Sequence, residues 1–165
     1  MSKVYSLKTV QLIPVDINTA WTFFSRPDNL KDITPSSLGF DIISNHHGAV
    51  MYPGQIIEYK VKPLLGIPLY WMTEITHVVD KQYFVDEQRF GPYSLWHHQH
   101  HFKAVSNGVE MTDIVHYKIP FGWLGDIANG ILVKQQLEHI FNYRFTAVEQ
   151  RFGKHPSSKC EIVFG

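Results

Sequence analysis

Histidines and carboxylates are concentrated in one part of the chain. The run WHHQHHF at residues 96–102 contains four histidines, and the run MTDIVHY at residues 111–117 adds an aspartate, a fifth histidine and a tyrosine. Imidazoles and carboxylates transfer protons near neutral pH and bind metal ions. What these side chains can do depends on which of them the fold places on one face.

The dipeptide Asn107-Gly108 separates the two runs. It predicts a β-hairpin, because both central residues of a type I′ turn need positive φ. A two-residue loop at this dipeptide pairs Ser106 with Val109, Phe102 with Asp113, His100 with Val115, and His98 with Tyr117.

Side chains alternate between the two faces of a strand, which decides what each face of the hairpin carries. His97, His101 and His116 fall on the face expected to be solvated. The opposite face is large, aromatic and selectively polar, which suits a ligand cavity better than a close-packed core, because buried polar groups need partners. It carries Trp96, His98, His100, Phe102, Met111, Asp113, Val115 and Tyr117.

A second turn, Gly91-Pro92-Tyr93, leads into the hairpin from the preceding strand. With these residues as the loop, Asp86 faces His98, and Gln88 faces Trp96. A second carboxylate and an amide are therefore expected on the same wall.

The rest of the chain supplies the elements around this wall. Asp16 or Asn18 can cap a short helix over Ala20–Ser25, and a second short helix starts at Asp28-Asn29 and ends before Pro35. A helical period of apolar residues predicts one long amphipathic helix over Asp126–Phe152, ended by Gly153. Residues 161–164 form either an edge strand or a frayed end. Further strands are expected at 3–13, 40–45, 55–62, 69–79 and 83–90.

This order predicts an α+β fold. A curved antiparallel sheet of about six or seven strands wraps around the long C-terminal helix, with two short helices after the first strand. Residues 1–153 form the domain, and residues 154–165 form a C-terminal tail.

Composition excludes several partners. The 165 residues contain 15 basic and 15 acidic residues with no basic run, which argues against nucleic acid and anionic membranes as partners. The single cysteine, Cys160, fits a reducing compartment. We expect a cytoplasmic protein without stable membrane insertion, because the first residues lack a signal-peptide pattern and no window approaches about 20 apolar residues.

Four phrases, AWTFFSRPDNLKDITP, FVDEQRFGPYSLWHHQHHF, MTDIVHYKIPFG and FNYR, carry a family resemblance. Over roughly residues 3–152 the chain resembles the START-like or SRPBCC superfamily, and in particular its bacterial ligand-binding proteins, some of which are labelled cell-division inhibitors. The resemblance implies a helix-grip fold with a hydrophobic cavity between sheet and C-terminal helix. Such cavities take lipids, polyketides, sterols, quinones or other small apolar molecules.

The expected function is therefore binding of a small hydrophobic or amphipathic ligand of the lipid, polyketide, quinone or aromatic type, with no cofactor. An interaction module with a collapsed cavity is a third reading, after the enzyme described below. Tyr59 and Phe141 are expected to line the cavity. The expected ligand contacts are Trp71, Asp86, Gln88, Trp96, His98, His100, Asp113, Tyr117 and Arg144.

The alternative to simple binding is an enzyme. A histidine held by a carboxylate in an apolar pocket could move protons during a cyclisation or dehydration, as in the polyketide cyclases that the resemblance includes. Asp113 with His100, or Asp86 with His98, would be that pair. No nucleophile motif accompanies them, and Cys160 lies in the tail.

A metal site is geometrically conceivable but is not assigned from the sequence. His98, His100 and Asp113 could form a two-histidine, one-carboxylate site. Their spacing matches no compact zinc signature and no cysteine joins them, so a buried hydrogen-bonded network is preferred.

Two side chains have open roles. Arg144 either lies along the helix surface or turns inward to meet the sheet carboxylates or a ligand carboxylate. Trp123 lies in a glycine-spaced loop before the long helix, where it could act as a lid over the cavity or as a plain hydrophobic anchor.

Overall fold

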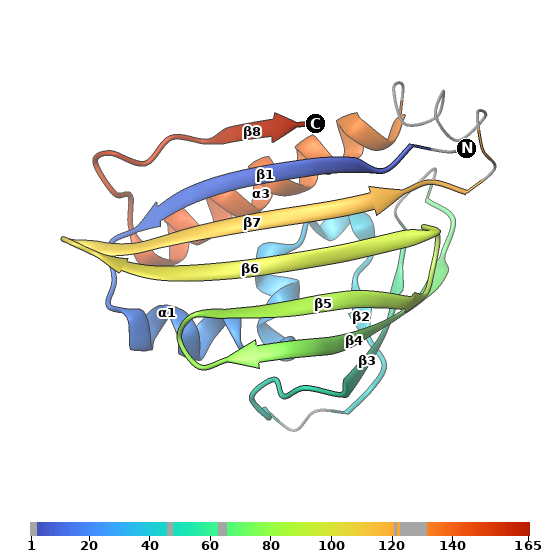
Figure 1. The fold of residues 1–165 in the computed structure, drawn as a ribbon, viewed down its shortest axis with the longest axis horizontal. Helices are drawn as coiled ribbons and strands as arrows, with labels where there is room; N and C mark the ends of the chain where they lie inside the picture. The colour runs from blue at the N-terminus through green and yellow to red at the C-terminus, as the bar shows by residue number, and fades with distance from the viewer. Residues whose placement is uncertain (1–2, 46–47, 63–65, 121, 123–131) are drawn as a thin grey trace.

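A single antiparallel sheet of eight strands dominates the computed structural model, which describes residues 3–45, 48–62, 66–120, 122 and 132–165. The strand order is β2-β3-β4-β5-β6-β7-β1-β8 (Figure 1). The strands are β1 (Tyr5–Ile13), β2 (Asp41–Ile42), β3 (Gln55–Val61), β4 (Leu69–Val79), β5 (Tyr83–Phe90), β6 (Leu95–Val105), β7 (Gly108–Lys118) and β8 (Glu161–Phe164).

The helices lie on one face of this sheet, and the long C-terminal helix passes behind β1 and β7 in the view of Figure 1. This is the α+β arrangement of a helix-grip fold, and it confirms the predicted fold class. The helices are α1 (Ile17–Phe24), the 3₁₀ helices η1 (Pro27–Ile33) and η2 (Ser36–Leu38), and α3 (Lys134–Phe152).

Both edges of the sheet are short strands. β2 has two residues, where a strand over residues 40–45 was expected, and it pairs only with β3. β8 has four residues and pairs with β1, so residues 161–164 take the edge-strand alternative. The long strands β4, β6 and β7, with 11 residues each, are interior.

The N-cap of α1 is Asp16, one of the two residues that the sequence offered for this position. Its Oδ1 accepts hydrogen bonds from the backbone N–H groups of Asn18 (2.9 Å) and Thr19 (3.1 Å). These bonds satisfy donors that a helix N-terminus leaves without intrahelical partners, and the helix therefore begins at Ile17, ahead of the predicted Ala20. The expected second short helix is present as η1, with Pro27 in its first turn.

The register of the β6–β7 hairpin differs from the prediction by two residues. Val105 pairs with Gly108, so the loop is Ser106-Asn107 and not Asn107-Gly108. As a result the predicted pairs Ser106–Val109, Phe102–Asp113, His100–Val115 and His98–Tyr117 are wrong. The observed partners are Phe102 with Met111, His100 with Asp113, His98 with Val115, and Trp96 with Tyr117.

The backbone at the turn explains this difference. Asn107 alone has the left-handed conformation, with φ of 86°, whereas Gly108 has φ of 159° and is already part of the extended strand. A Cβ at Gly108 would lie 2.3 Å from the carbonyl oxygen of Ile13. Glycine at position 108 therefore serves a close approach between β7 and the end of β1, and not the turn itself.

One of the two predicted β5–β6 pairs is observed, and the paired region ends at Glu87 with His97, before Gln88 and Trp96. Asp86 pairs with His98. Gln88 holds the loop closed, because its Nε2 donates to the Tyr93 carbonyl (2.6 Å) and its Oε1 accepts from the Tyr93 N–H (3.2 Å).

Helix α3 ends as predicted, at Phe152 followed by Gly153 with φ of 93°. It begins at Lys134, and residues 132–133 directly before it are π-helical. Most of the earlier part of the predicted helix lies outside the described residues, and so does Trp123, for which a lid and a hydrophobic anchor were the two alternatives. The buried residues of α3 are Leu137, Phe141 and Val148.

Two hydrophobic clusters lie between the sheet and the helices. One packs α1, through Trp21 and Phe24, against Phe102, while the other packs Leu137 and Phe141 of α3 against strand residues. On β7, Met111 belongs to the first cluster and Val115 to the second, so Asp113 lies at the boundary between them.

Candidate functional site

A cavity of about 170 Å³ lies between the sheet and the helices. Most of its wall is apolar, and a polar group of side chains from β5, β6 and α3 occupies one part of it. The wall comprises Leu30, Ile33, Thr34, Leu38, Phe40, Met51, Ile57, Tyr59, Val61, Trp71, Thr73, Ile75, Phe84, Asp86, Tyr93, Trp96, His98, His100, Gln136, Leu137, Ile140, Phe141 and Arg144.

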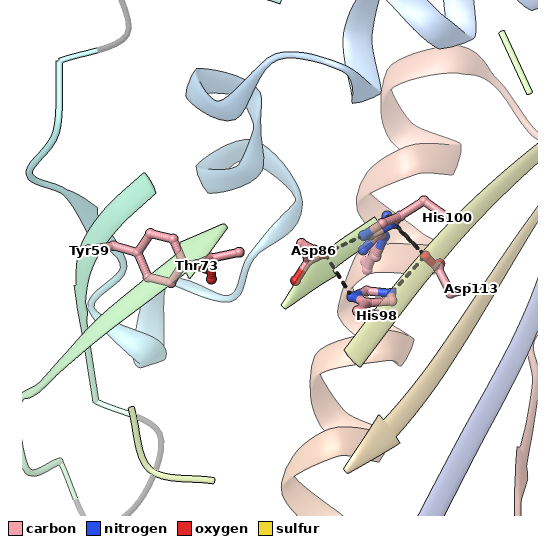
Figure 2. A network of polar contacts seen from close by, with 7 residues as sticks. Tyr59, Thr73, Asp86, His98, His100 and Asp113 are labelled. Carbon is pink, nitrogen blue, oxygen red and sulfur yellow. Dashed lines mark hydrogen bonds and ion pairs between the residues drawn. The ribbon is translucent and has the colours of Figure 1, made fainter. Parts of the chain in front are cut away.

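The polar group is built around two histidines on the inner face of β6. His98 and His100 are two residues apart on one strand, so their rings are neighbours, with centroids 3.7 Å apart (Figure 2). Both rings are buried. Each ring nitrogen lies within 4 Å of a carboxylate oxygen, which makes a closed arrangement of two imidazoles and two carboxylates.

Asp113 of β7 contacts one side of this histidine pair. Its Oδ1 lies 3.0 Å from His98 Nε2 and 2.8 Å from His100 Nδ1. The side chain of Asp113 is only 6% exposed. One carboxylate oxygen therefore orients both imidazoles from behind the cavity wall.

Asp86 of β5 contacts the other side of the pair. Its Oδ2 lies 2.8 Å from His100 Nε2 and 3.6 Å from His98 Nδ1. Its Oδ1 makes no hydrogen bond to the residues that the structure describes, and the side chain is 16% exposed. In the view of Figure 2, Asp86 lies between the imidazoles and the pair Tyr59–Thr73.

Arg144 turns inward from α3. Its Nη2 lies 3.4 Å from Asp113 Oδ1 and 3.4 Å from His100 Nδ1, and the side chain is 12% exposed. The inward alternative for this residue is therefore observed, and the cation meets a sheet carboxylate. Arg144 also joins α3 electrostatically to the centre of the sheet.

Aromatic rings hold the two imidazoles in place. The Phe84 ring stacks on His100 with centroids 4.2 Å apart, and Phe141 meets His98 at 5.9 Å. Trp96 packs edge-to-face on His98 at 6.1 Å. This close aromatic packing fixes the ring positions, which matters because their polar contacts depend on orientation.

The carboxylates of the group are ionised. Burial would raise the pKa of Asp113, but the Arg144 guanidinium and the hydrogen bonds from His100 and His98 outweigh it and hold the pKa well below its usual range. Burial opposes ionisation of Asp86 too, and the hydrogen bond from His100 with the nearby positive charges lowers the pKa of this carboxyl.

The two imidazoles are driven apart in pKa. Burial would lower the pKa of His100, but hydrogen bonds to Asp113 and Asp86 raise it above its ordinary value, so His100 is the ring that keeps its positive charge to higher pH. For His98, burial and the neighbouring His100 charge lower the pKa despite the hydrogen bond to Asp113. His98 is therefore the ring that becomes neutral first as pH rises, and the neutral ring keeps its proton on Nε2, 3.0 Å from Asp113 Oδ1, with a lone pair on Nδ1. The group as a whole balances Asp86 and Asp113 against His100 and Arg144.

A second polar pair lies elsewhere on the cavity wall. The Tyr59 hydroxyl bonds to Thr73 Oγ1, both side chains being buried. Burial and the negative charge of Asp86 raise the pKa of Tyr59, so the phenol remains protonated.

Six of the nine ligand contacts expected from the sequence line the cavity, namely Trp71, Asp86, Trp96, His98, His100 and Arg144. The other three lie off its wall. Gln88 is occupied in closing the β5–β6 loop, and Asp113 lies behind the histidines. Tyr117 is packed in the hydrophobic cluster with Leu137.

Several cavity residues were missed from the sequence. Phe84 and Thr73 could have been found, because each lies two residues from an expected wall residue of its strand, Asp86 and Trp71, and so shares its face. The aliphatic residues of η1 and η2, such as Ile33 and Leu38, carry no comparable signal.

The sequence matches no family model and no curated protein. Solved structures share its fold. A protein from Chromobacterium violaceum matches with a TM-score of 0.68 and 11% identity over 91% of this chain and 99% of that chain. Protein Ms6760 from Mycobacterium smegmatis matches with a TM-score of 0.62 and 15% identity, over 88% of this chain and 92% of that chain. Major latex-like protein 151 from Panax ginseng matches with a TM-score of 0.65 and 12% identity, over 90% of this chain and 97% of that chain.

At these identities the likeness defines the fold, which is consistent with the helix-grip type expected from the sequence. In the part of the chain that the structure describes, no helix combines the length and apolar character needed to cross a bilayer.

Proposed function

We propose that the protein binds a small amphipathic molecule in the cavity between the sheet and α3. The observation that carries this proposal is a mostly apolar cavity whose wall contains a buried, charge-balanced polar group. Binding sites for small molecules have this form, with a mostly apolar lining and a few polar groups that fix orientation.

The size of the cavity narrows the ligand class. Its volume of about 170 Å³ is close to the ~150 Å³ of an apolar cavity that holds one benzene molecule. A single ring fills it. Among lipid, polyketide, quinone and aromatic ligands, the volume favours a molecule whose enclosed part is one aromatic or quinone-type ring.

The polar side chains restrict the chemistry of the ligand's polar end. Asp86 Oδ1 is available as an acceptor, so a hydroxyl or N–H of the ligand can donate to it. Because Asp86 and Asp113 are already balanced by His100 and Arg144, a neutral head adds no unpaired charge to the buried site. The proposed ligand is therefore a neutral ring with a hydrogen-bond donor, such as a phenol.

Two neighbouring residues of β3 give a matched test. Ile57 is buried and lines the cavity, whereas Ile56 points to the other face and is 42% exposed. Ile57→Phe fills the cavity, and Ile56→Phe adds the same atoms outside it. Binding of phenol and p-cresol, measured by calorimetry, is expected to weaken about tenfold or more in Ile57→Phe and to stay within about twofold in Ile56→Phe.

Thermal unfolding of both variants, and native mass spectrometry of gently purified protein, complete the experiment. Equal phenol affinity in Ile57→Phe and the wild type, with Ile57→Phe folded, would place binding outside the cavity. Extraction of a ring-containing compound from the native protein would name the physiological ligand.

A cyclase or dehydratase is the second candidate, and the position of His98 Nδ1 on the cavity wall favours it. This nitrogen is a neutral base on the cavity wall, 3.6 Å from Asp86 Oδ2. It could take a proton from a carbon next to a carbonyl group, and the resulting imidazolium could return the proton to a departing hydroxyl, which leaves as water.

A β-hydroxy ketone tests the enzyme against the binding protein. An enzyme would form the conjugated enone, and His98→Gln would slow this reaction by about a hundredfold or more. A binding protein would form no enone, and His98→Gln would change phenol affinity by only a few fold.

A further inference from the structure

We propose that Asp86, His98 and His100 form a binding site for one divalent transition-metal ion, with open coordination positions toward the cavity. The inference stands apart from the proposed organic ligand, because it concerns only protein side chains and a cation. All three side chains lie on the cavity wall, so an ion held by them would be reached from the cavity.

The three ligand atoms already converge. Asp86 Oδ2 lies 2.8 Å from His100 Nε2 and 3.6 Å from His98 Nδ1, and all three atoms lie within 4.8 Å of one another. An ion bound at about 2.0–2.2 Å from each atom holds them roughly 3–3.5 Å apart. Side-chain movements of about an ångström, with loss of the proton from His100 Nε2, therefore convert the hydrogen-bonded arrangement into a coordination site.

The outer nitrogens of both histidines are held as metal sites require. A histidine that binds a metal through one nitrogen normally donates its other N–H to a carboxylate, which fixes the tautomer and the ring orientation. Asp113 Oδ1 supplies this contact to His98 Nε2 and to His100 Nδ1. With both outer nitrogens directed at Asp113, His98 Nδ1 and His100 Nε2 are the nitrogens that face Asp86.

The guanidinium of Arg144 decides which carboxylate is the ligand. Arg144 Nη2 lies 3.4 Å from Asp113 Oδ1, so a cation already occupies that side of the histidine pair. The Asp86 side has no cationic side chain within ion-pair distance among the described residues apart from the two imidazoles. Asp86, and not Asp113 as the sequence spacing had allowed, is therefore the carboxylate of the site.

The donor set selects the class of ion. Two imidazole nitrogens and one carboxylate suit Zn²⁺, Fe²⁺, Co²⁺ or Ni²⁺, whereas Mg²⁺ and Ca²⁺ prefer all-oxygen sites. Three protein ligands leave one or more positions open. When both imidazoles are neutral, the charged groups of the site are Asp86, Asp113, Arg144 and the divalent ion. Their charges sum to one positive charge, so an anionic oxygen donor is the expected additional ligand.

Titration of the untagged, chelator-treated full chain with Co²⁺ alone tests the site, since Co²⁺ bound to nitrogen and oxygen ligands absorbs visible light. We expect one equivalent bound. Asp86→Asn and His98→Gln should each weaken binding at least tenfold, and Asp113→Asn should weaken it by about 10–100-fold through the outer contact. Calorimetry with Zn²⁺ gives the same ranking by a second readout.

The chain provides a matched control on the outer face of the same strands. His97 Nδ1 lies 3.1 Å from Glu87 Oε1, so His97→Gln removes a neighbouring histidine–carboxylate pair from β6 and β5. This variant should bind Co²⁺ like the wild type. Circular dichroism shows which variants are folded, and the conservative His98→Gln keeps the test valid if Asp86→Asn unfolds.

Three results would overturn the proposal. They are no Co²⁺ or Zn²⁺ binding at millimolar concentration, binding that folded His98→Gln retains in full, and binding that His97→Gln abolishes instead. None of these results depends on phenol affinity, so the ligand-binding proposal and the metal proposal can fail separately.

Discussion

His98 and His100 lie with their ring centroids 3.7 Å apart and share one acceptor, Asp113 Oδ1, yet their surroundings favour opposite protonation states. Two adjacent positive rings would repel each other in a buried site. His100 contacts both carboxylates at 2.8 Å, so it retains the charge, while His98 is left as the neutral base.

The first prediction concerns the pH titration of these two rings in metal-free protein. Asp86 from β5, Asp113 from β7 and Arg144 from α3 are the charged groups that face them. NMR of the ring protons should show His100 titrating above the ordinary value of 6.5 and His98 below it. Coincident titration of both rings near 6.5 would contradict the assignment.

These shifts have opposite effects on stability. The raised pKa of His100 stabilises the fold below about pH 6.5, and this contribution is lost as pH rises through the folded-state pKa. The lowered pKa of His98 has the opposite effect, and it reduces the stability of the fold as pH falls below about 6.5. In that range the unfolded chain gains a proton at His98 that the folded protein does not accept. Asp113→Asn should lower the pKa of both rings, because the hydrogen bond that each ring donates to the Asp113 carboxylate is the strongest contact raising its pKa.

Arg144→Met is predicted to destabilise the protein by about 3–5 kcal/mol, because the two buried carboxylates Asp86 and Asp113 then share only the positive charge of His100. Arg151 is the matched control on the same helix. It is half exposed, lies 3.6 Å from Asp32, and its replacement by methionine should cost about 1 kcal/mol or less. Urea denaturation measures both, and equal losses would show that Arg144 contributes only as a surface residue does.

Gly108→Ala is predicted to destabilise the protein by about 1–3 kcal/mol, because the added methyl group meets the Ile13 carbonyl oxygen. Ser106→Ala, at the exposed loop two residues earlier, should change stability by no more than about 0.5 kcal/mol. The pair tests the observed register in denaturation experiments. If Asn107-Gly108 were the turn, Gly108→Ala would lose stability through left-handed backbone strain. Gly108→Asn would then be more stable than Gly108→Ala, because asparagine tolerates that conformation.

The sequence predicted which side chains share a face more reliably than which residues pair. The observed hairpin is shifted by two residues from the predicted one, and a shift of two leaves every side chain on its face. His98, His100 and Asp113 were thus correctly placed on the inner face although their partners were wrong. The turn signal of Asn-Gly was real, but the contact of Gly108 with Ile13 is tertiary and has no local signature.

The cavity itself could not be predicted in the same way. Whether Arg144 turns inward depends on the rotation of α3 against the sheet, which the helical period alone leaves undecided. The separation of Gln88 and Tyr117 from the cavity wall also follows from packing, because Gln88 is hydrogen-bonded to Tyr93 and the Tyr117 ring stacks on Tyr5. The alternation of side chains along a strand can be read from neighbouring residues, whereas a cavity between the sheet and the helices depends on how distant segments pack.

The shortness of β2 and β8 has a consequence for how molecules of this protein meet one another. A neighbouring chain can extend a sheet only by bonding to free backbone groups along an edge, and the outermost strands here have only two and four residues. The 11-residue strands, which would template fibrous growth most readily, are enclosed on both sides. The molecule can therefore keep a hollow, aromatic interior at high concentration without its sheet serving as a seed for aggregation.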